Sequence, residues 1–276
     1  MPMIIGGEED NIVFYDLEKQ TYYLFDGDMK MNKKLETKRY GPFIQNGGGY
    51  HPGTKKILGT FAFFVNVNVI EFKTFTRKIG EKKLHNEVIC RLKKWVKSSK
   101  QQWIIGYPFH TKIIDDYIYM LRTDEYRLSK MDLEGKVIKE IKVTNIDKKS
   151  FSNSTRSEWI RQSLLKDPVR FIFPGELWSA CWLLDLGDGI AVGRRKNYKP
   201  TDVEWIEADY FDKNLNYLGK IEVPGFSHWN DPALGQERLD FLFHFQNDKL
   251  FMIDIRETEE GEDFWLTRWR QESEKR

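Results

Sequence analysis

A pair of aspartate-marked turns recurs along the chain and restricts the fold more than any other feature. The first mark is an acidic residue, then any residue, then alternating apolar positions. The second is a large apolar residue followed by Asp, with an aliphatic residue nine positions after that Asp. Asp and Gly favour such turns because they tolerate positive φ or hydrogen-bond to their own backbone. The first mark occurs at Asp10, Asp116, Asp188 and Asp248, and the second at Asp26, Asp132 and Asp212.

The spacing of the two marks indicates a structural repeat. The interval is 16 residues from Asp10 to Asp26 and again in the unit of Asp132, but 24 in the unit of Asp212, which predicts an eight-residue insertion. Each unit therefore reads as a short antiparallel meander, which cannot cover both of its faces alone. Packing of neighbouring meanders around an axis covers them, as in a β-propeller.

We expect five units within one domain of residues 1–276, and the second of them is only weakly marked. One helix is also expected, because Thr155 and Glu158 form a capping box and Pro168 ends the apolar pattern that follows. The units are expected at about residues 3–35, 50–80, 101–143, 169–225 and 236–270, with the helical linker at about 155–166.

Two of these units resemble a known kind of blade. The segments YRLSKMDLEGKVIKEI and WIEADYFDKNLNYLGKIEVPG are similar to blades of the bacterial six-bladed β-propeller proteins, relatives of the NHL-repeat propellers. In those blades an apolar-Asp-x-x-Gly-Lys turn joins the third and fourth strands. The resemblance implies an all-β fold of four-stranded antiparallel blades. Five recognisable units against six imply that an N-terminal blade is missing or incomplete.

A glycine run lies between the first and second units. Residues 36–54 are rich in Gly and Pro and contain Gly47, Gly48 and Gly49. A phosphate-binding loop requires a GxxxxGK[ST] pattern that opens a helix, and this pattern is absent. We therefore expect a flexible connection between blades.

Charge is balanced over the whole chain but not over residues 71–100. The chain has 44 basic and 42 acidic residues, so it offers no general attraction to nucleic acid. Residues 71–100 carry ten Lys or Arg against three Glu, interleaved with Phe72, Phe75 and Trp95. Single-stranded nucleic acid binders use this mixture, but the balanced remainder of the chain argues against that function. Both helical and strand periodicity fit the segment from Leu84 to Val96, so its structure stays open.

The sequence contains no run of 18 apolar residues, and no membrane span is expected. The start MPMIIGGEEDN is not a signal peptide, which predicts a cytoplasmic protein as written, or a secreted or periplasmic one if the natural start lies upstream. Cys90 and Cys181 have no metal-binding spacing, and we expect two unrelated thiols.

No catalytic motif occurs, so the leading hypothesis is a non-enzymatic binding propeller. Its channel-mouth loops would bind a protein, a peptide or a glycan, and no cofactor is expected. Aromatic residues in two loops are the candidate contacts. The candidate binding residues are Trp178, Trp182, His228, Trp229 and Asp231.

The alternative hypothesis is a metal-assisted hydrolase or lactonase in the central channel. His51, His110 and His244 lie four, six and four residues before the first mark of their units, taking Lys55 as the mark of the second unit. Even offsets place side chains on one face of a strand, so all three could point into the channel. Three imidazoles could hold a divalent metal such as Zn²⁺ with a position open for water.

Overall fold

The computed structural model is built from antiparallel sheets, and the part of the chain that it describes contains no helix. The described residues are 2–8, 11–16, 21–26, 28, 30–36, 48–51, 53–66, 69–78, 86–95, 103–104, 109–123, 125–144, 149–150, 171–172, 176–177, 180–194, 205–224, 243–246, 249–258 and 261–270. The predicted all-β class and the four-stranded antiparallel sheets are confirmed. The helix predicted at 155–166 lies outside the described residues.

The first unit forms a four-stranded meander in which each strand pairs with the next. Its strands are β1 (Pro2–Glu8), β2 (Asn11–Asp16), β3 (Thr21–Phe25) and β4 (Met31–Glu36). The tyrosines Tyr15 and Tyr22 face each other across β2 and β3, with ring centroids 4.6 Å apart. Both are fully buried, so the apolar face of this sheet is covered.

The second and third units form two meanders that join into one eight-stranded sheet. A single parallel pairing, Lys112 with Gly48, connects them through their first strands. The second unit contains β5 (Gly48–His51), β6 (Lys56–Asn66), β7 (Val69–Lys78) and β8 (Asn86–Trp95). The third contains β10 (Phe109–Ile114), β11 (Tyr117–Arg122), β12 (Arg127–Met131) and β13 (Val137–Lys142).

Two sequence interpretations change in this region. The segment left open between helix and strand is β8, which pairs with β7 along its length. The glycine run does not form a flexible connection alone, because Gly48 and Gly49 begin strand β5. A Cβ on Gly49 would lie 2.6 Å from the backbone nitrogen of Ile113 and 2.7 Å from its Cβ. Glycine is therefore required here so that β5 can approach β10.

The last two units complete the set of meanders. The fourth contains β17 (Ala180–Asp185), β18 (Gly189–Arg194), β19 (Trp205–Asp212) and β20 (Tyr217–Pro224). The fifth contains β21 (Phe243–Gln246), β22 (Lys249–Thr258) and β23 (Gly261–Arg270). Two-residue strands form two small pairs, β9 (Trp103–Ile104) with β15 (Phe171–Ile172) and β14 (Lys149–Ser150) with β16 (Glu176–Leu177).

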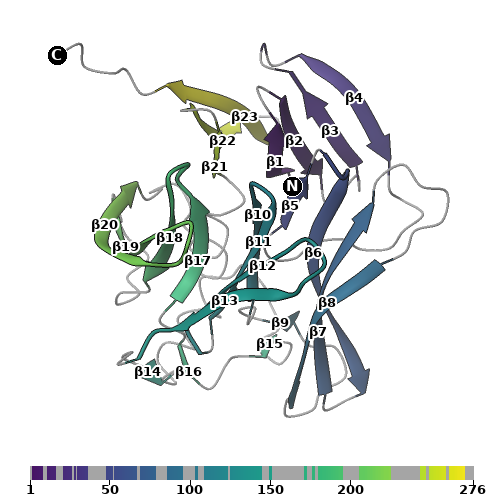
Figure 1. Cartoon of the computed structure of the whole chain (residues 1–276). Coiled ribbons are helices and arrows are strands. Elements are labelled where there is room, and N and C mark those ends of the chain that lie inside the picture. The colour runs from purple at the N-terminus through teal and green to yellow at the C-terminus, as the bar shows by residue number, and fades with distance from the viewer. Residues whose placement is uncertain are drawn as a thin grey trace.

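We call the meander of each unit a sheet, so the second and third sheets are the two halves of the eight-stranded one. The first strands of these five sheets contact one another in a cyclic order. β1 contacts β5, β5 contacts β10, β10 contacts β17, β17 contacts β21, and β21 contacts β1. In Figure 1 these strands lie toward the middle of the molecule, with β4 and β20 toward its outside. The sheets therefore approach each other along their first strands.

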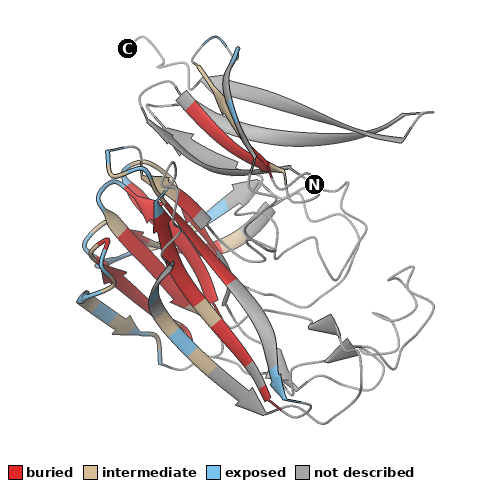
Figure 2. Cartoon of the chain, turned by 90° about the vertical axis from the view of Figure 1, so that its right-hand side faces the viewer, coloured by how far each residue is buried: buried red, intermediate tan, exposed pale blue. Residues whose placement is uncertain are grey.

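Apolar side chains fill the spaces between neighbouring sheets. One cluster joins the second and third sheets through Leu58, Phe72, Ile118 and Met131. Another joins the third and fourth sheets and includes Tyr119, Leu128, Val192 and Phe211. Figure 2 shows buried residues along the inner strands, whereas exposed residues lie in turns and along outer strands such as β13. Both faces of the third sheet are thus covered, as hydrophobic burial requires.

Candidate functional site

The aspartates of the second mark form the same turn wherever the structure describes it. In each turn one carboxylate oxygen accepts hydrogen bonds from the backbone N–H groups two and four residues later. The aspartate's own N–H donates to the carbonyl four residues later, and the strand register shifts just before the aspartate. The turns and their N–H to Oδ1 distances are Asp26 (3.0 and 2.9 Å), Asp132 (3.1 and 2.8 Å) and Asp212 (2.8 and 2.8 Å).

A left-handed residue completes this turn. Gly135 has φ of 86° and Leu215, the equivalent residue three positions after Asp212, has φ of 60°. A non-glycine residue is strained in this region, but Leu215 is buried in the core between the third and fourth sheets. Hydrogen bonds from the backbone and side-chain amides of Asn216 lower the pKa of Asp212. The carboxylate form therefore stabilises the turn.

All of these turns lie at one end of the sheets, which we call the turn end. It comprises the turns after each first strand and after each third strand, because strands in a meander alternate in direction. The opposite end, which we call the connection end, comprises the turns after each second strand and the segments that lead from one sheet to the next. Candidate residues at the two ends therefore belong to different surfaces.

Polar contacts connect neighbouring sheets at the turn end. The Lys213 ammonium lies 2.8 Å from Asp115 Oδ2, joining the fourth sheet to the third. The Lys56 ammonium lies 3.5 Å from Glu134 Oε1, joining the second sheet to the third. His51 also reaches the third sheet, through Asp116. The turn end is therefore used to hold adjacent sheets together.

His51 has both ring nitrogens engaged in contacts within the chain. Its Nδ1 accepts a hydrogen bond from the Thr54 backbone N–H at 3.1 Å and lies 2.9 Å from the Thr54 hydroxyl. Its Nε2 lies 2.9 Å from Asp116 Oδ1. The neutral ring therefore carries its proton on Nε2 and donates it to the Asp116 carboxylate.

The structure does not bring His51 and His110 together. His51 ends β5 at the turn end, level with Asp115 by the pairing of Gly48 with Lys112. His110 begins β10, five residues from Asp115 and therefore roughly 16 Å away along the strand. The two histidines lie at different positions along their strands because β5 ends at His51 and is followed by a longer turn. In the third sheet Asp115 and Asp116 alone make the turn.

The remaining evidence on the metal hypothesis concerns His110 and His244. His110 is buried on β10, paired with Leu121. His244 lies on β21 opposite Phe251, and only its backbone is described. No group of three His, Cys, Asp or Glu residues that could hold a metal ion occurs among the described side chains. The hydrolase alternative, which depends on His244, stays a prediction.

Of the residues predicted to bind a partner, the structure describes only the backbone of Trp182, near the connection end of the fourth sheet. Trp182 lies near the start of β17, opposite Gly193, and its side chain is not described. The segment predicted to carry the aromatic loop follows β20, which ends at Pro224. Trp178, His228, Trp229 and Asp231 lie outside the described residues, so their role stays a prediction.

The basic stretch and the cysteines are placed only in part. Phe72 and Phe75 are buried in the second sheet, so neither ring is exposed for stacking on a base. Cys90 is a free thiol, and its partial burial raises its pKa. Within the described ranges no helix has the length and apolar character needed to cross a membrane.

Sequence reasoning missed the surroundings of two acidic side chains, the half-buried Asp185 and the buried Asp209. Burial raises the pKa of Asp185, which accepts the N–H of Gly187 at 2.9 Å, while the nearby Lys112 and Lys213 lower it. The Tyr126 hydroxyl donates to the buried carboxylate of Asp209. Both positions stand within otherwise apolar strand or turn patterns, and no local signal in the sequence identifies them.

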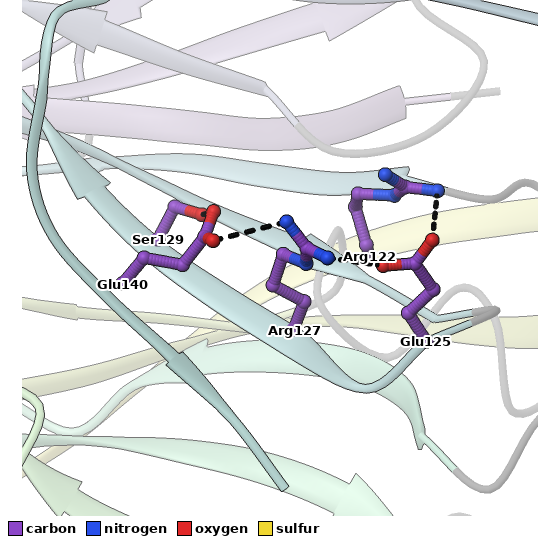
Figure 3. A network of polar contacts seen from close by, with 5 residues as sticks. All are labelled: Arg122, Glu125, Arg127, Ser129 and Glu140. Atoms are coloured by element: carbon purple, nitrogen blue, oxygen red, sulfur yellow. Dashed lines mark hydrogen bonds and ion pairs between the residues drawn. The ribbon is translucent and has the colours of Figure 1, made fainter.

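A chain of charged groups lies on the third sheet near its connection end (Figure 3). Glu125 accepts a hydrogen bond from Arg122 at 2.9 Å and forms an ion pair with Arg127 at 2.7 Å. Arg127 continues to Glu140 at 3.0 Å, and Glu140 accepts the Ser129 hydroxyl at 2.8 Å. Each carboxylate has a cationic partner, so the network fixes the turn between β11 and β12 against β13.

Comparisons with known proteins give no family and only distant structural similarity. No model of a protein family matches the sequence, and no curated protein matches it. Similar solved structures include a member of the DUF4221 family from Bacteroides vulgatus, with a TM-score of 0.42 and 10% identity over 98% of this chain and 93% of that chain. They also include a putative exported protein from Bacteroides fragilis, with a TM-score of 0.40 and 8% identity over 91% of this chain and 78% of that chain.

A further solved structure is KlHsv2 with its loop 6CD replaced by a Gly-Ser linker. Its TM-score is 0.29 and its identity 8%, over 98% of both chains. At these values the similarity is to β-sheet-rich chains in general, and it supports no statement about activity.

Proposed function

We propose that the five sheets form a β-propeller and that this propeller binds a protein, peptide or glycan at its connection end, without catalysing a reaction. The observation that carries the proposal is the cyclic contact of β1, β5, β10, β17 and β21. A closed order of first strands surrounds an axis, and loops gather at each end of such an axis. Propellers use these loops for recognition.

The two ends differ in what their described polar contacts join: those at the turn end join neighbouring sheets, whereas the Arg122 to Glu140 network at the connection end lies within the third sheet. At the turn end, His51 binds Asp116, Lys213 binds Asp115, and the Asp212 carboxylate binds its own turn. A ligand there would have to compete with contacts that join the sheets. The connection end carries the longer segments, including those of Trp178 and Trp229. It is therefore the better candidate for recognition.

The experiment is a binding screen followed by substitution. The purified chain is presented to a glycan array and to a displayed peptide library, and the ligands found are titrated by biolayer interferometry. Trp178→Ala and Trp229→Ala should each weaken binding by about tenfold or more, as for an aromatic contact in an interface. The control is Asp28→Ala, which changes an exposed side chain at the turn end. Equal affinity of the tryptophan variants and the unchanged chain would contradict the proposal.

A further inference from the structure

The outer strand of the fourth sheet has an open edge with large exposed side chains at its start. β20 (Tyr217–Pro224) pairs with β19 on one side only, so within the described part of the chain its other edge is free. Tyr217 and Leu218 are 56% and 57% exposed at the start of this edge. Tyr217 packs edge-on against Phe211, with ring centroids 5.6 Å apart, which holds the tyrosine in place.

Gly219 leaves the backbone of this edge open. Its φ of 147° is a conformation that favours glycine, and no atom lies within 4 Å of the place where a Cβ would stand. The register of β20 against β19 shifts beside this glycine, so its positive φ belongs to a β-bulge. Without a side chain, Gly219 leaves the edge of the backbone uncovered at this point.

Charged side chains usually prevent natural edge strands from pairing. On β20, a lysine and a glutamate lie two residues apart, so the charges of one copy can pair with those of a second copy. Lys220 lies 3.1 Å from Glu207 Oε1 on the neighbouring strand and remains half exposed. Glu222 is exposed, makes no hydrogen bond or ion pair with the described residues, and pairs in register with Glu207, a like charge. Like charges opposite each other across two strands are unfavourable, so Glu222 would gain from a cation on its open side.

We infer that β20 pairs antiparallel with β20 of a second copy of this chain, about a two-fold axis at Ile221. In this register Lys220 of each copy lies opposite Glu222 of the other. Each Glu222 therefore gains a lysine ammonium as its partner. Tyr217 and Leu218 then lie at both ends of the paired segment and cover the partner's backbone. A two-fold interface uses the same patch on both subunits, so the patch must be complementary to itself. A positive and a negative residue on either side of Ile221 meet this requirement.

The outer strand of the third sheet provides a contrast. β13 is also an edge and exposes Val137 and Ile138 at 51% and 54%. Its acidic residue, however, is used within the chain, because Glu140 binds Arg127 and Ser129, whereas Glu222 of β20 has no such contact with the described residues. Of these two edges, only β20 therefore presents an acidic side chain that would gain from a cation, and Ile138→Lys is a matched control for Leu218→Lys.

Analytical ultracentrifugation of the full chain, from low to high micromolar concentration, tests the pairing. The unchanged chain should form a dimer, and Lys220→Glu and Glu222→Lys should each raise its Kd by about tenfold or more. The double variant K220E/E222K restores opposite charges across the axis and should recover dimerisation. Leu218→Lys should weaken the dimer, and Ile138→Lys should leave it unchanged.

Three results would overturn the inference: a monomer at every concentration, a dimer that responds to Ile138→Lys but not to Leu218→Lys, or a double charge variant no better than the singles. Thermal unfolding of each variant under dilute conditions shows that the monomer is still folded, as expected for exposed positions where ion pairs contribute little. The test does not involve the connection end, so its failure would leave the proposed binding function untouched.

Discussion

Gly49 lies where the first strands of the second and third sheets approach too closely for a side chain. A methyl group there would meet the backbone of Ile113, which cannot rotate away. Gly49→Ala should therefore lower the free energy of unfolding by about 1–3 kcal/mol, the usual cost of overpacking. Chemical denaturation measures this change. Gly53→Ala is the control, because its added methyl would meet only the His51 ring at 3.3 Å, and an equal loss in both variants would contradict the argument.

Tyr126 and Asp209 connect the third and fourth sheets by a buried hydrogen bond. Tyr126→Phe removes the donor and leaves the carboxylate in a buried position with one partner fewer. The free energy of unfolding should fall by about 1–3 kcal/mol, as measured by urea denaturation. Tyr210→Phe is the matched variant, since that hydroxyl donates to the exposed Asp188 at 2.7 Å. It should cost less than about 1 kcal/mol, and a larger loss there than at Tyr126 would refute the prediction.

At the scale of the element, the aspartate turn makes stability depend on pH. The folded pKa of Asp212 is lowered by hydrogen bonds from Asn216, so the turn is stabilised above the ordinary carboxyl range. That contribution is lost as the pH falls through the folded pKa, because the carboxylate is then protonated in both states. At neutral pH the unchanged chain should therefore have a larger free energy of unfolding than the Asp212→Asn variant. This difference should shrink below about pH 4.

Urea denaturation of both proteins at neutral and acidic pH measures this difference. Asp28→Asn serves as the control, because Asp28 contributes its backbone N–H to the turn and its side chain accepts no hydrogen bond from the described residues. A difference between the chain and Asp212→Asn that does not change with pH would show that the charge has no role.

Local signals in the sequence predicted the elements well. The turns at Asp26, Asp132 and Asp212 follow from short-range chemistry, because each carboxylate bonds to amides at most four residues away. The alternating pattern around them identified strands such as β2 and β3. What could not be predicted depends on residues distant in sequence. Gly49 was read as part of a connection because the need for glycine comes from Ile113, on another sheet.

The candidate site shows the same division between local and distant information. Even spacing predicted that His51 and His110 lie on the same face of their strands. Their positions along the strands, however, depend on the length of each first strand, and β5 ends at His51. The partners of His51 and Tyr126 come from other sheets, so no pattern in one segment reveals them. Phe72 and Phe75 stand among lysines in a pattern that single-stranded nucleic acid binders also use, but both rings are buried, which only the packing of the sheets shows.

For the whole molecule, the decisive question is whether the first strands close a ring. In an open stack of repeats the end units have one neighbour each and unfold more readily than the middle. In a ring every sheet has two neighbours, and the contact between β1 and β21 replaces the missing end. We therefore expect hydrogen exchange in β1 and β21 to be nearly as slow as in β10 and β17.

Hydrogen exchange of the intact chain, followed by mass spectrometry of peptides, measures this directly. Peptides covering Pro2–Glu8 and Phe243–Gln246 report on the closing contact, and Phe109–Ile114 reports on the middle of the chain. The outer strand β4 is the internal control. It and β1 each pair with one strand of their sheet, but β1 also packs against β5 and β21, so β4 should exchange faster than β1 in either arrangement. Exchange of β1 and β21 that is fast together, while β10 stays protected, would show an open stack and would contradict the proposed propeller.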